Sequence, residues 1–286
     1  MNPPYSTSQE VNARNSMPLH HLFVEKYAYA IPYSVFIIPQ RWFITGKGLD
    51  DFRKGFKNRT DIKSINWFEN SKEVFGNHVD IKGGVVVITR DESHDGLCNF
   101  DDTIMDLKVS DVVLSPKAYQ IYFSGQGHCN KQGCIDAFFK GRYYGIETND
   151  DRLKDNSSSS SKLCFVSMKQ SKDRKKYIEM DGALEKKEQF WKVFTPAAFE
   201  KANSGFGPLY IAKPEELHSA SYVSFQVKNY AEALSLQSYL KTKYANELLS
   251  IRKASQLISK DTLKWIPNVP LDRIWNDENL EQYLSH

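Results

Sequence analysis

Hydrophobic positions in residues 1–90 alternate between helical and strand spacing. Apolar residues recur at helical intervals over residues 19–30, and Pro32 ends that pattern. A continuous apolar run from Tyr33 to Ile38 follows, which predicts a strand buried on both faces.

The alternation continues to about residue 90. Leu49, Phe52 and Phe56 share one face of a predicted helix. Residues 62–68 predict the next strand, and residues 85–88 predict another after a pair of glycines. Strands and helices in this rhythm are typical of a mostly parallel α/β sheet. Residues 1–90 are long enough for half of such a sheet.

The pattern becomes irregular from about residue 95. Segments are short and rich in turn residues, which predicts a β-rich, loop-rich region. The run Ser157–Ser161 predicts an exposed loop. Residues 172–176 form a charged patch that we interpret as solvated surface. A long helical pattern follows Asn229, so a helix is expected over about 229–258.

Composition limits the cell compartment and the class of protein. With 286 residues, 41% of them hydrophobic, the chain can form one large or two medium domains. No apolar run reaches the roughly 20 residues of a membrane helix, and no signal peptide follows Met1. We therefore expect a cytoplasmic protein without a membrane partner.

Net charge alone gives little indication of nucleic-acid binding. The formal charge is only +3, but residues 237–264 contain six basic and two acidic residues. Such a basic segment is compatible with contact to phosphates, although most charge runs are solvated faces.

The four cysteines do not predict a disulfide scaffold. Cys98, Cys129, Cys134 and Cys164 are few and scattered for a chain of this size. His128 with Cys129 and Cys134 could supply zinc ligands, but a second ligand pair at regular spacing is lacking. We expect reduced thiols in a loop and no metal site.

The tetrapeptide Asn2-Pro3-Pro4-Tyr5 is the most distinctive local feature. Two prolines stiffen the backbone and leave only carbonyl acceptors. The Asn2 side-chain oxygen is a further acceptor, and the Tyr5 ring can lie against a heterocycle. The group therefore either holds a flat base that carries an amine or forms an ordinary Pro-Pro turn.

Several sequence blocks together resemble a known family. Asn2–Tyr5 resembles motif IV of adenine-specific DNA methyltransferases. Residues 21–26, 38–53, 70–75 and 79–85 are similar, in order, to the segments that follow this motif in methylases of the Eco57I type, from restriction–modification systems. Residues 238–243, 249–253, 259–262 and 265–267 resemble the closing helix and exit of that family. The resemblance covers residues 1 to about 90 and 190 to 280.

This resemblance implies the transfer of a methyl group from S-adenosylmethionine to the exocyclic amine of adenine in double-stranded DNA. Asn2 and the Pro3 carbonyl would accept hydrogen bonds from the amine. Tyr5 would stack on the base once it has left the duplex. Asn2, Pro3, Pro4 and Tyr5 are therefore the expected catalytic residues.

The resemblance also implies an organisation. The expected fold class is α/β: the rear half of a Rossmann-like methyltransferase sheet, then a β-rich target-recognition region and a C-terminal helix. The expected ranges are 1–94 for the catalytic half, 95–228 for target recognition and 229–286 for the helical segment and tail.

In the family, a Gly-rich turn and an acidic residue that bind the methyl donor precede motif IV, and this chain has no residues before Met1 that could supply them. We expect that the chain lacks the complete donor site and is inactive alone, as a fragment or split subunit. The alternative is a non-catalytic DNA-recognition or interaction subunit that pairs with a separate cofactor-binding chain.

Candidate DNA contacts come from basic and aromatic residues in the matched blocks. They are Arg41, Trp42, Lys47, Lys241, Lys243, Arg252 and Lys253. For Trp42, packing in the core with Arg41 exposed is the favoured alternative.

Overall fold

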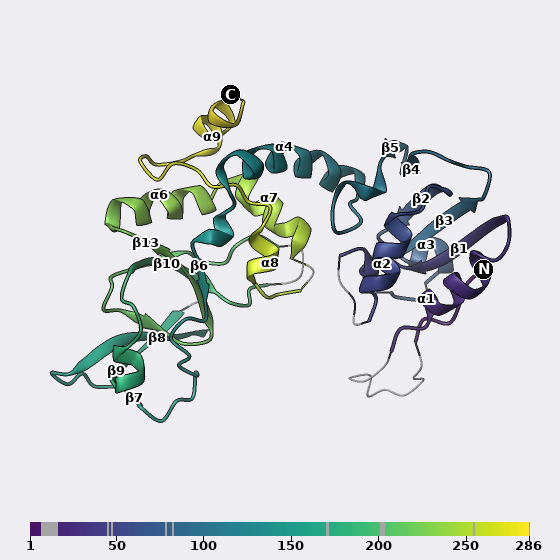
Figure 1. Ribbon diagram of the computed structural model, residues 1–286. Helices are drawn as coiled ribbons and strands as arrows, with labels where there is room; N and C mark the ends of the chain where they lie inside the picture. The colour runs from purple at the N-terminus through teal and green to yellow at the C-terminus, as the bar shows by residue number, and fades with distance from the viewer. Residues whose placement is uncertain are drawn as a thin grey trace. The chain divides into compact units, whose positions relative to one another are not determined.

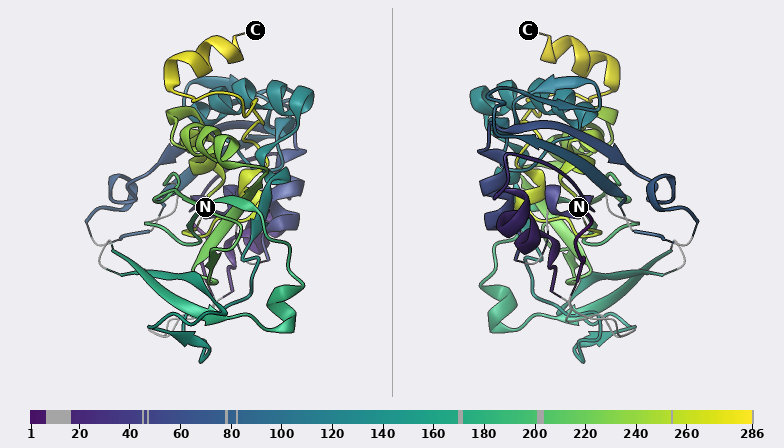
Figure 2. Two further views of the ribbon diagram at one scale, coloured as in Figure 1. Left: turned by 90° about the vertical axis from the view of Figure 1, so that its left-hand side faces the viewer. Right: turned by 90° about the vertical axis from the view of Figure 1, so that its right-hand side faces the viewer.

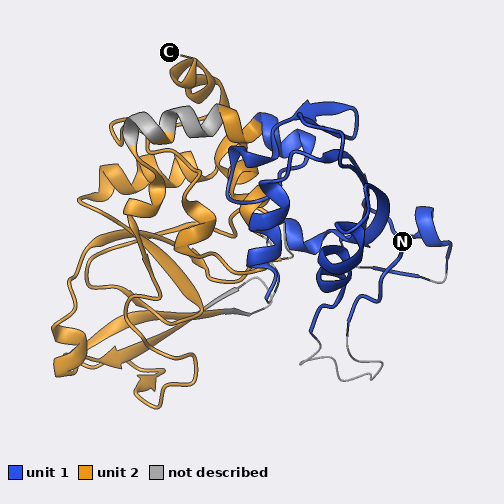
Figure 3. Ribbon diagram, turned by 45° about the vertical axis from the view of Figure 1, so that its right-hand side comes forward, with its two compact units in different colours: residues 1–120 blue, residues 121–286 orange. Residues whose placement is uncertain are grey.

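A computed structural model describes residues 1–6, 17–44, 46, 48–77, 79–81, 83–169, 172–200, 204–253 and 255–285. It is a mixed α/β structure with three sheets, which confirms the predicted class (Figure 1). The chain divides into two compact units, residues 1–120 and 121–286 (Figure 3). The boundary thus lies later than the predicted division at residue 94. Residues 229–286 belong to the same unit as residues 121–228, and the functional ranges themselves stay predictions.

Unit 1 contains a five-stranded sheet in the order β1-β3-β2-β4-β5. The strands are β1 (Tyr33–Pro39), β2 (Ile62–Phe68), β3 (Val85–Asp91), β4 (Cys98–Phe100) and β5 (Thr103–Met105). The first three confirm the strands predicted from apolar runs. The short strands β4 and β5 lie beyond residue 95, where we expected the second region to begin.

The expectation of a mostly parallel sheet is wrong. β3 lies between β1 and β2 and runs antiparallel to both, and among the described strands of this sheet the pair β2 and β4 is parallel. Hydrophobic periodicity indicates which face of a strand is buried, but it carries no information about the partner or its direction. β1 and β2 still point the same way, because each is antiparallel to β3.

β1 is buried on one face, and not on both as expected. Its exposure alternates along the strand: Phe36 and Ile38 are buried, whereas Tyr33 and Val35 are 57% and 39% exposed. The apolar run therefore correctly predicted a strand, but the second face of that strand is exposed at Tyr33 and Val35.

Short helices surround this sheet. They are α1 (His20–Phe23), a π-helical turn η2 (Val24–Ala28), the 3-10 helix η3 (Gln40–Phe43), α2 (Asp50–Lys57), α3 (Lys72–Phe75) and η4 (Leu107–Val109). Leu49, Phe52 and Phe56 are buried as predicted. The Trp42 ring packs edge-on against Phe52 and Phe56, with centroids 4.9 and 4.7 Å apart. This aromatic cluster fixes α2 relative to the end of β1.

Gly84 is required where the chain enters β3. Its φ of 78° favours glycine, and a Cβ there would lie 2.1 Å from the backbone oxygen of Phe68. The Gly84 carbonyl accepts from the backbone N–H of Gln40, the residue after β1. Gly84 thus lies close against the end of β2, and its hydrogen bond links the start of β3 to the end of β1.

Unit 2 contains two four-stranded sheets. One has the order β11-β10-β13-β6, and the other has the order β12-β8-β9-β7. Their strands are β6 (Phe139–Gly141), β7 (Leu153–Lys154), β8 (Ser161–Lys169), β9 (Lys172–Glu179), β10 (Trp191–Pro196), β11 (Tyr210–Ala212), β12 (Leu217–His218) and β13 (Tyr222–Val227). The β-rich character expected after residue 95 is present here, and residues 157–160 are exposed as predicted.

The helices of unit 2 differ most from expectation. They are α4 (Pro116–Gln132, which crosses the unit boundary), η5 (Ile135–Ala137), α5 (Gly182–Glu185), α6 (Tyr230–Leu240), α7 (Lys243–Arg252), α8 (Lys260–Leu263) and α9 (Asp277–Leu284). The single helix expected over 229–258 is two helices, because Thr242 caps α7 by accepting from the N–H of Ala245. The 17-residue helix α4 was not predicted.

Candidate functional site

The tetrapeptide Asn2–Tyr5 lies beside the outer edge of β1. The amino group of Met1 donates to the Val35 carbonyl (2.6 Å), and the Ile37 N–H donates to the Met1 carbonyl (3.0 Å). These two bonds on either side of Phe36 are the pattern of a parallel strand pair. Since β1 runs on to Pro39, Asn2–Tyr5 leaves the ladder toward the carboxyl end of β1.

Within the tetrapeptide, Tyr5 orients Asn2. The Tyr5 hydroxyl donates to the Asn2 side-chain oxygen at 2.8 Å, and the Leu19 N–H donates to the Tyr5 carbonyl at 3.1 Å. Pro3 is buried, while Asn2 and Pro4 are exposed. An amide oxygen has two lone pairs, so Asn2 can accept a second hydrogen bond while Tyr5 holds it. Partial burial raises the pKa of Tyr5 to about 12, which keeps its hydroxyl a donor at neutral pH.

His20 lies beside Tyr5 and was not among the predicted site residues. Its ring contacts Tyr5 edge-on with centroids 6.4 Å apart, and it contacts Phe52 on the other side at 6.5 Å. Burial lowers the pKa of His20 to about 4, so the imidazole is neutral at pH 7. A neutral, buried ring supports the position of Tyr5 but adds no positive charge. No sequence signal separated His20 from an ordinary helical residue.

Arg41 and Trp42 follow β1 directly, and the structure separates them. Arg41 is exposed, and its charge contributes to the lowered pKa of His20 nearby. Trp42 has no exposed surface, because its ring fills the aromatic cluster over α2. The expectation that Trp42 contacts DNA is therefore wrong, and the alternative of core packing holds. Arg41 stays a candidate.

Two of the predicted basic contacts in unit 2 are structural. The Lys253 ammonium is buried and donates to the backbone oxygens of Phe199 and Gly205, at 3.2 and 3.1 Å. Arg252 is 5% exposed, pairs with Asp261 at 2.9 Å and lies over the Trp265 ring. Both cations are withdrawn from solvent by internal acceptors, so they do not reach phosphates.

The other predicted basic contacts keep their status as candidates or lie outside the described residues. Lys241 is exposed. The Lys243 side chain is 77% exposed and lies 4.0 Å from Glu247. Lys47 lies outside the residues that the structure describes.

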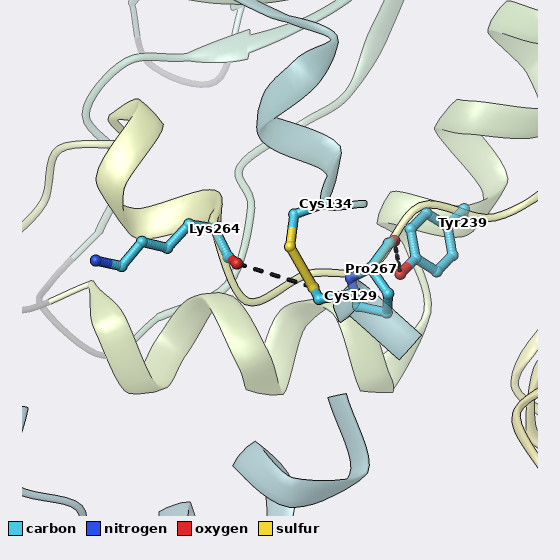
Figure 4. The surroundings of a disulfide bond; sticks show 5 residues. All are labelled: Cys129, Cys134, Tyr239, Lys264 and Pro267. Carbon is cyan, nitrogen blue, oxygen red and sulfur yellow. Dashed lines mark hydrogen bonds between the residues drawn. A yellow bond between two sulfur atoms is a disulfide. The ribbon is translucent and has the colours of Figure 1, made fainter. Parts of the chain in front are cut away.

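The expectation of reduced thiols at Cys129 and Cys134 is wrong. The two residues form a disulfide that closes the end of α4 (Figure 4). Cys134 also pairs with Pro267 in an isolated antiparallel bridge, and the Pro267 carbonyl accepts from the Tyr239 hydroxyl at 2.7 Å. The cross-link therefore lies where α4 meets the segment after α8. Among the described residues, no group of three or more His, Cys, Asp or Glu side chains could hold a metal ion.

The tetrapeptide adjoins the outer edge of the five-stranded sheet. β1 is an edge strand, and Met1 is the described residue that pairs with its outer side. Three cavities formed by described residues, of 220, 350 and 380 Å³, are lined by residues other than Asn2–Tyr5. Gly46 precedes a helix, but a Cβ there would lie 2.7 Å from Leu49 Cδ1, so its role is local packing.

Comparison with known families gives one match, which covers the tetrapeptide. Residues 1–75 match a family model. The matched family is the Eco57I restriction-modification methylase. The match confirms the resemblance for residues 1–75, and the resemblance over residues 190–280 stays a prediction.

Solved structures similar to the chain are restriction–modification enzymes, at low similarity. The type IIG restriction endonuclease BpuSI has 12% identity and a TM-score of 0.35, with 95% of this chain and 44% of BpuSI covered. The type IIL enzyme MmeI in complex with DNA has 10% identity and a TM-score of 0.41, with 90% of this chain and 42% of MmeI covered. The chain spans less than half of the length of either enzyme.

No curated protein matches the sequence. Within the described residues, no helix is both long and apolar enough to cross a membrane.

Proposed function

We propose that the chain is the base-binding and DNA-contacting part of an adenine-specific DNA methyltransferase of a restriction–modification system. The observation that carries this proposal is the position of Asn2–Tyr5. Met1 pairs in parallel with β1, so the tetrapeptide lies toward the carboxyl end of a strand, where α/β sheets bind their ligands. The match of residues 1–75 to the methylase family supports the same assignment.

The roles of the tetrapeptide follow from its contacts. The second lone pair of the Asn2 side-chain oxygen accepts one amino proton of adenine, and the rigid Pro3 backbone offers its carbonyl for the other. The half-buried Tyr5 ring stacks on the extruded base, an interaction of roughly 1–3 kcal/mol. The bond from Tyr5 to Asn2 holds the amide and the ring in one fixed relation.

S-adenosylmethionine is the proposed methyl donor, as in the family that residues 1–75 match. We propose that the part of the enzyme that binds it lies outside residues 1–286 and continues the sheet at the outer edge of β1. The chain is then inactive by itself. The partner in the reaction is double-stranded DNA, with Arg41, Lys241 and Lys243 as exposed candidates for phosphate contact.

The test is methylation of adenine in the DNA of a host that carries the complete system. Asn2→Ala removes the side-chain acceptor, and we expect the content of N6-methyladenine, measured by mass spectrometry, to fall at least about a hundredfold, as when a transition-state hydrogen-bond partner is lost. Asn66→Ala is the matched control, because Asn66 is exposed on β2. Equal methylation by both variants would contradict the proposal.

A second candidate function is a DNA-recognition or interaction subunit without catalysis. The position of β1 at the edge of the five-stranded sheet favours it, because a separate chain can continue a sheet at such an edge. In that case Asn2→Ala leaves both the affinity for DNA and the methylation of host DNA at the level of the Asn66→Ala control.

A further inference from the structure

The β8–β9 hairpin is a long ribbon with a concentrated positive charge. Its sequence from residue 169 to 176 contains five basic residues and one acidic residue. Figure 2 shows β8 and β9 as a two-stranded ribbon that extends away from the rest of unit 2. From the sequence, residues 172–176 were interpreted as solvated surface, and the proposed function leaves this ribbon without a role.

The base of the ribbon is fixed in a core. Cys164, Val166 and Ile178 are fully buried in one hydrophobic cluster, while Phe165 joins a second cluster on the opposite side. The register shifts between Phe165 and Ser167, and a bulge of this kind increases the local twist of a ribbon. The described part of the hairpin is therefore a rigid, twisted support.

The cations at the far end of the described ribbon are exposed and face opposite ways. Arg174 and Lys175 are both exposed. They are consecutive in β9, so their side chains point to opposite faces of the ribbon. Arg174 lies across from Ser167, and the Lys175 ammonium lies over the Phe165 ring, 4.7 Å from its centroid. Each face of the ribbon thus carries one exposed cation, and the two cations lie at nearly the same position along β9.

Lys176 differs from its two neighbours. Its ammonium pairs with Asp155 at 3.2 Å, and its side chain is only 17% exposed. Of these three consecutive cations, Arg174 and Lys175 are therefore the exposed ones.

We propose that the β8–β9 ribbon inserts into the major groove of double-stranded DNA, with Arg174 and Lys175 contacting phosphates on the two opposite walls. Two strands about 4.8 Å apart with their side chains match a groove about 12 Å wide, which admits a two-stranded ribbon. The choice of DNA as the partner rests on the proposed function. The ribbon then acts as the element that positions unit 2 on the duplex.

The experiment measures binding of the full chain to duplex DNA and to duplex RNA of the same sequence, by fluorescence anisotropy across a salt series. For Arg174→Ala/Lys175→Ala we expect DNA affinity to fall about tenfold or more near 0.1 M salt, and the slope of log affinity against log salt to decrease by about two. The deep, narrow major groove of RNA does not admit the ribbon, so RNA binding should change much less.

The control is Lys186→Ala/Lys228→Ala, which removes the same charge from two exposed positions of unit 2. Thermal melting of each variant verifies that the fold is retained. We expect the control to bind DNA within about twofold of the wild type, as for cations that do not contact phosphate.

The outcomes separate the inference from the proposed function. DNA binding by the wild type with no difference between the two double variants overturns the ribbon, while the proposed function stands. An equal loss on DNA and RNA also overturns groove insertion, because it indicates a general charge effect. A wild-type chain that binds neither duplex overturns both.

Discussion

At the scale of single residues, buried cations are the main feature of unit 2. Lys192 has no exposed surface, and its ammonium donates to the backbone oxygens of Lys213 (2.6 Å) and Glu216 (2.8 Å). It also lies over the Phe190 ring, 5.4 Å from the centroid. Lys192 therefore ties the turn between β11 and β12 to the middle of the sheet.

The burial of Lys192 predicts a dependence of stability on pH. Burial lowers the pKa of Lys192 from 10.5 to about 7 in the folded protein. Between these values the unfolded chain binds more protons, so the free energy of unfolding rises with pH, by at most about 1.4 kcal/mol per pH unit. Urea unfolding from neutral pH to about pH 10 should show this rise in the wild type and a smaller one in Lys192→Met. Parallel curves for the two proteins would show that Lys192 is charged in the folded state.

The sequence predicted some site residues but not their environment. The acceptors and ring of Asn2–Tyr5 follow from residue type, so their chemistry could be predicted. A lysine ammonium is either exposed on the surface or buried against backbone carbonyl groups. Which of the two occurs depends on carbonyl groups that are distant in the sequence. Lys253 is paired with Phe199 and Gly205, about fifty positions away, and no local pattern signals this. Trp42 was predicted in both roles, and packing decided between them.

At the scale of elements, the break between α6 and α7 has a local cause. The Thr242 side chain donates to the Tyr239 carbonyl at 2.7 Å, which ends α6, and accepts from the Ala245 N–H at 3.3 Å, which starts α7. The hydrophobic pattern predicted one helix over 229–258, because its helical spacing continues across the short break between α6 and α7. Cap residues decide where helices end, and Thr242 is a cap on both sides.

We expect Thr242→Ala to lower the free energy of unfolding by about 1 kcal/mol, the usual cost of a lost N-cap. Thr242→Ser keeps the hydroxyl and should recover most of the loss. Chemical unfolding followed by circular dichroism measures both. Equal stability of the Ala and Ser variants would show that the hydroxyl does not set the break.

The disulfide at the end of α4 predicts a redox dependence of stability. The cross-link joins residues five positions apart, and closing so short a loop stabilises the fold by about 2 kcal/mol in the chain-entropy model. A reducing agent should therefore lower the melting temperature of the wild type by a few degrees. Cys129→Ser/Cys134→Ser should melt at the reduced temperature with or without the agent. A further drop of that variant on reduction would point to another cause, since Cys98 and Cys164 are free and buried.

The elements differ in how far the sequence could define them. β1 and β2 were predicted because proline and polar residues delimit their apolar runs. The placement of β3 between them could not be predicted, since pairing depends on contacts across the whole unit. α4 was missed because Gly125 and Gly127 interrupt its sequence with residues that disfavour helices.

At the scale of the whole molecule, the proposed function places the base-binding group beside β1 and the methyl-donor site outside residues 1–286. We expect isothermal titration of the full chain with S-adenosylmethionine to give no binding up to about 100 μM, because the proposed function places the donor-binding pocket in another part of the enzyme. Titration with the complete enzyme of the system is the positive control. Micromolar binding by the chain alone would overturn the proposal that the donor site lies outside residues 1–286.

The bond from the Met1 amino group to Val35 has a practical consequence for protein production. Because Met1 pairs in parallel with β1, any residues joined before it continue along the strand edge toward Tyr33. We therefore expect a purification tag at that end to lie along the edge of the sheet beside exposed Tyr33 and Val35, where an added strand promotes aggregation. A tag joined before Met1 should therefore be removed by proteolysis before the measurements described above.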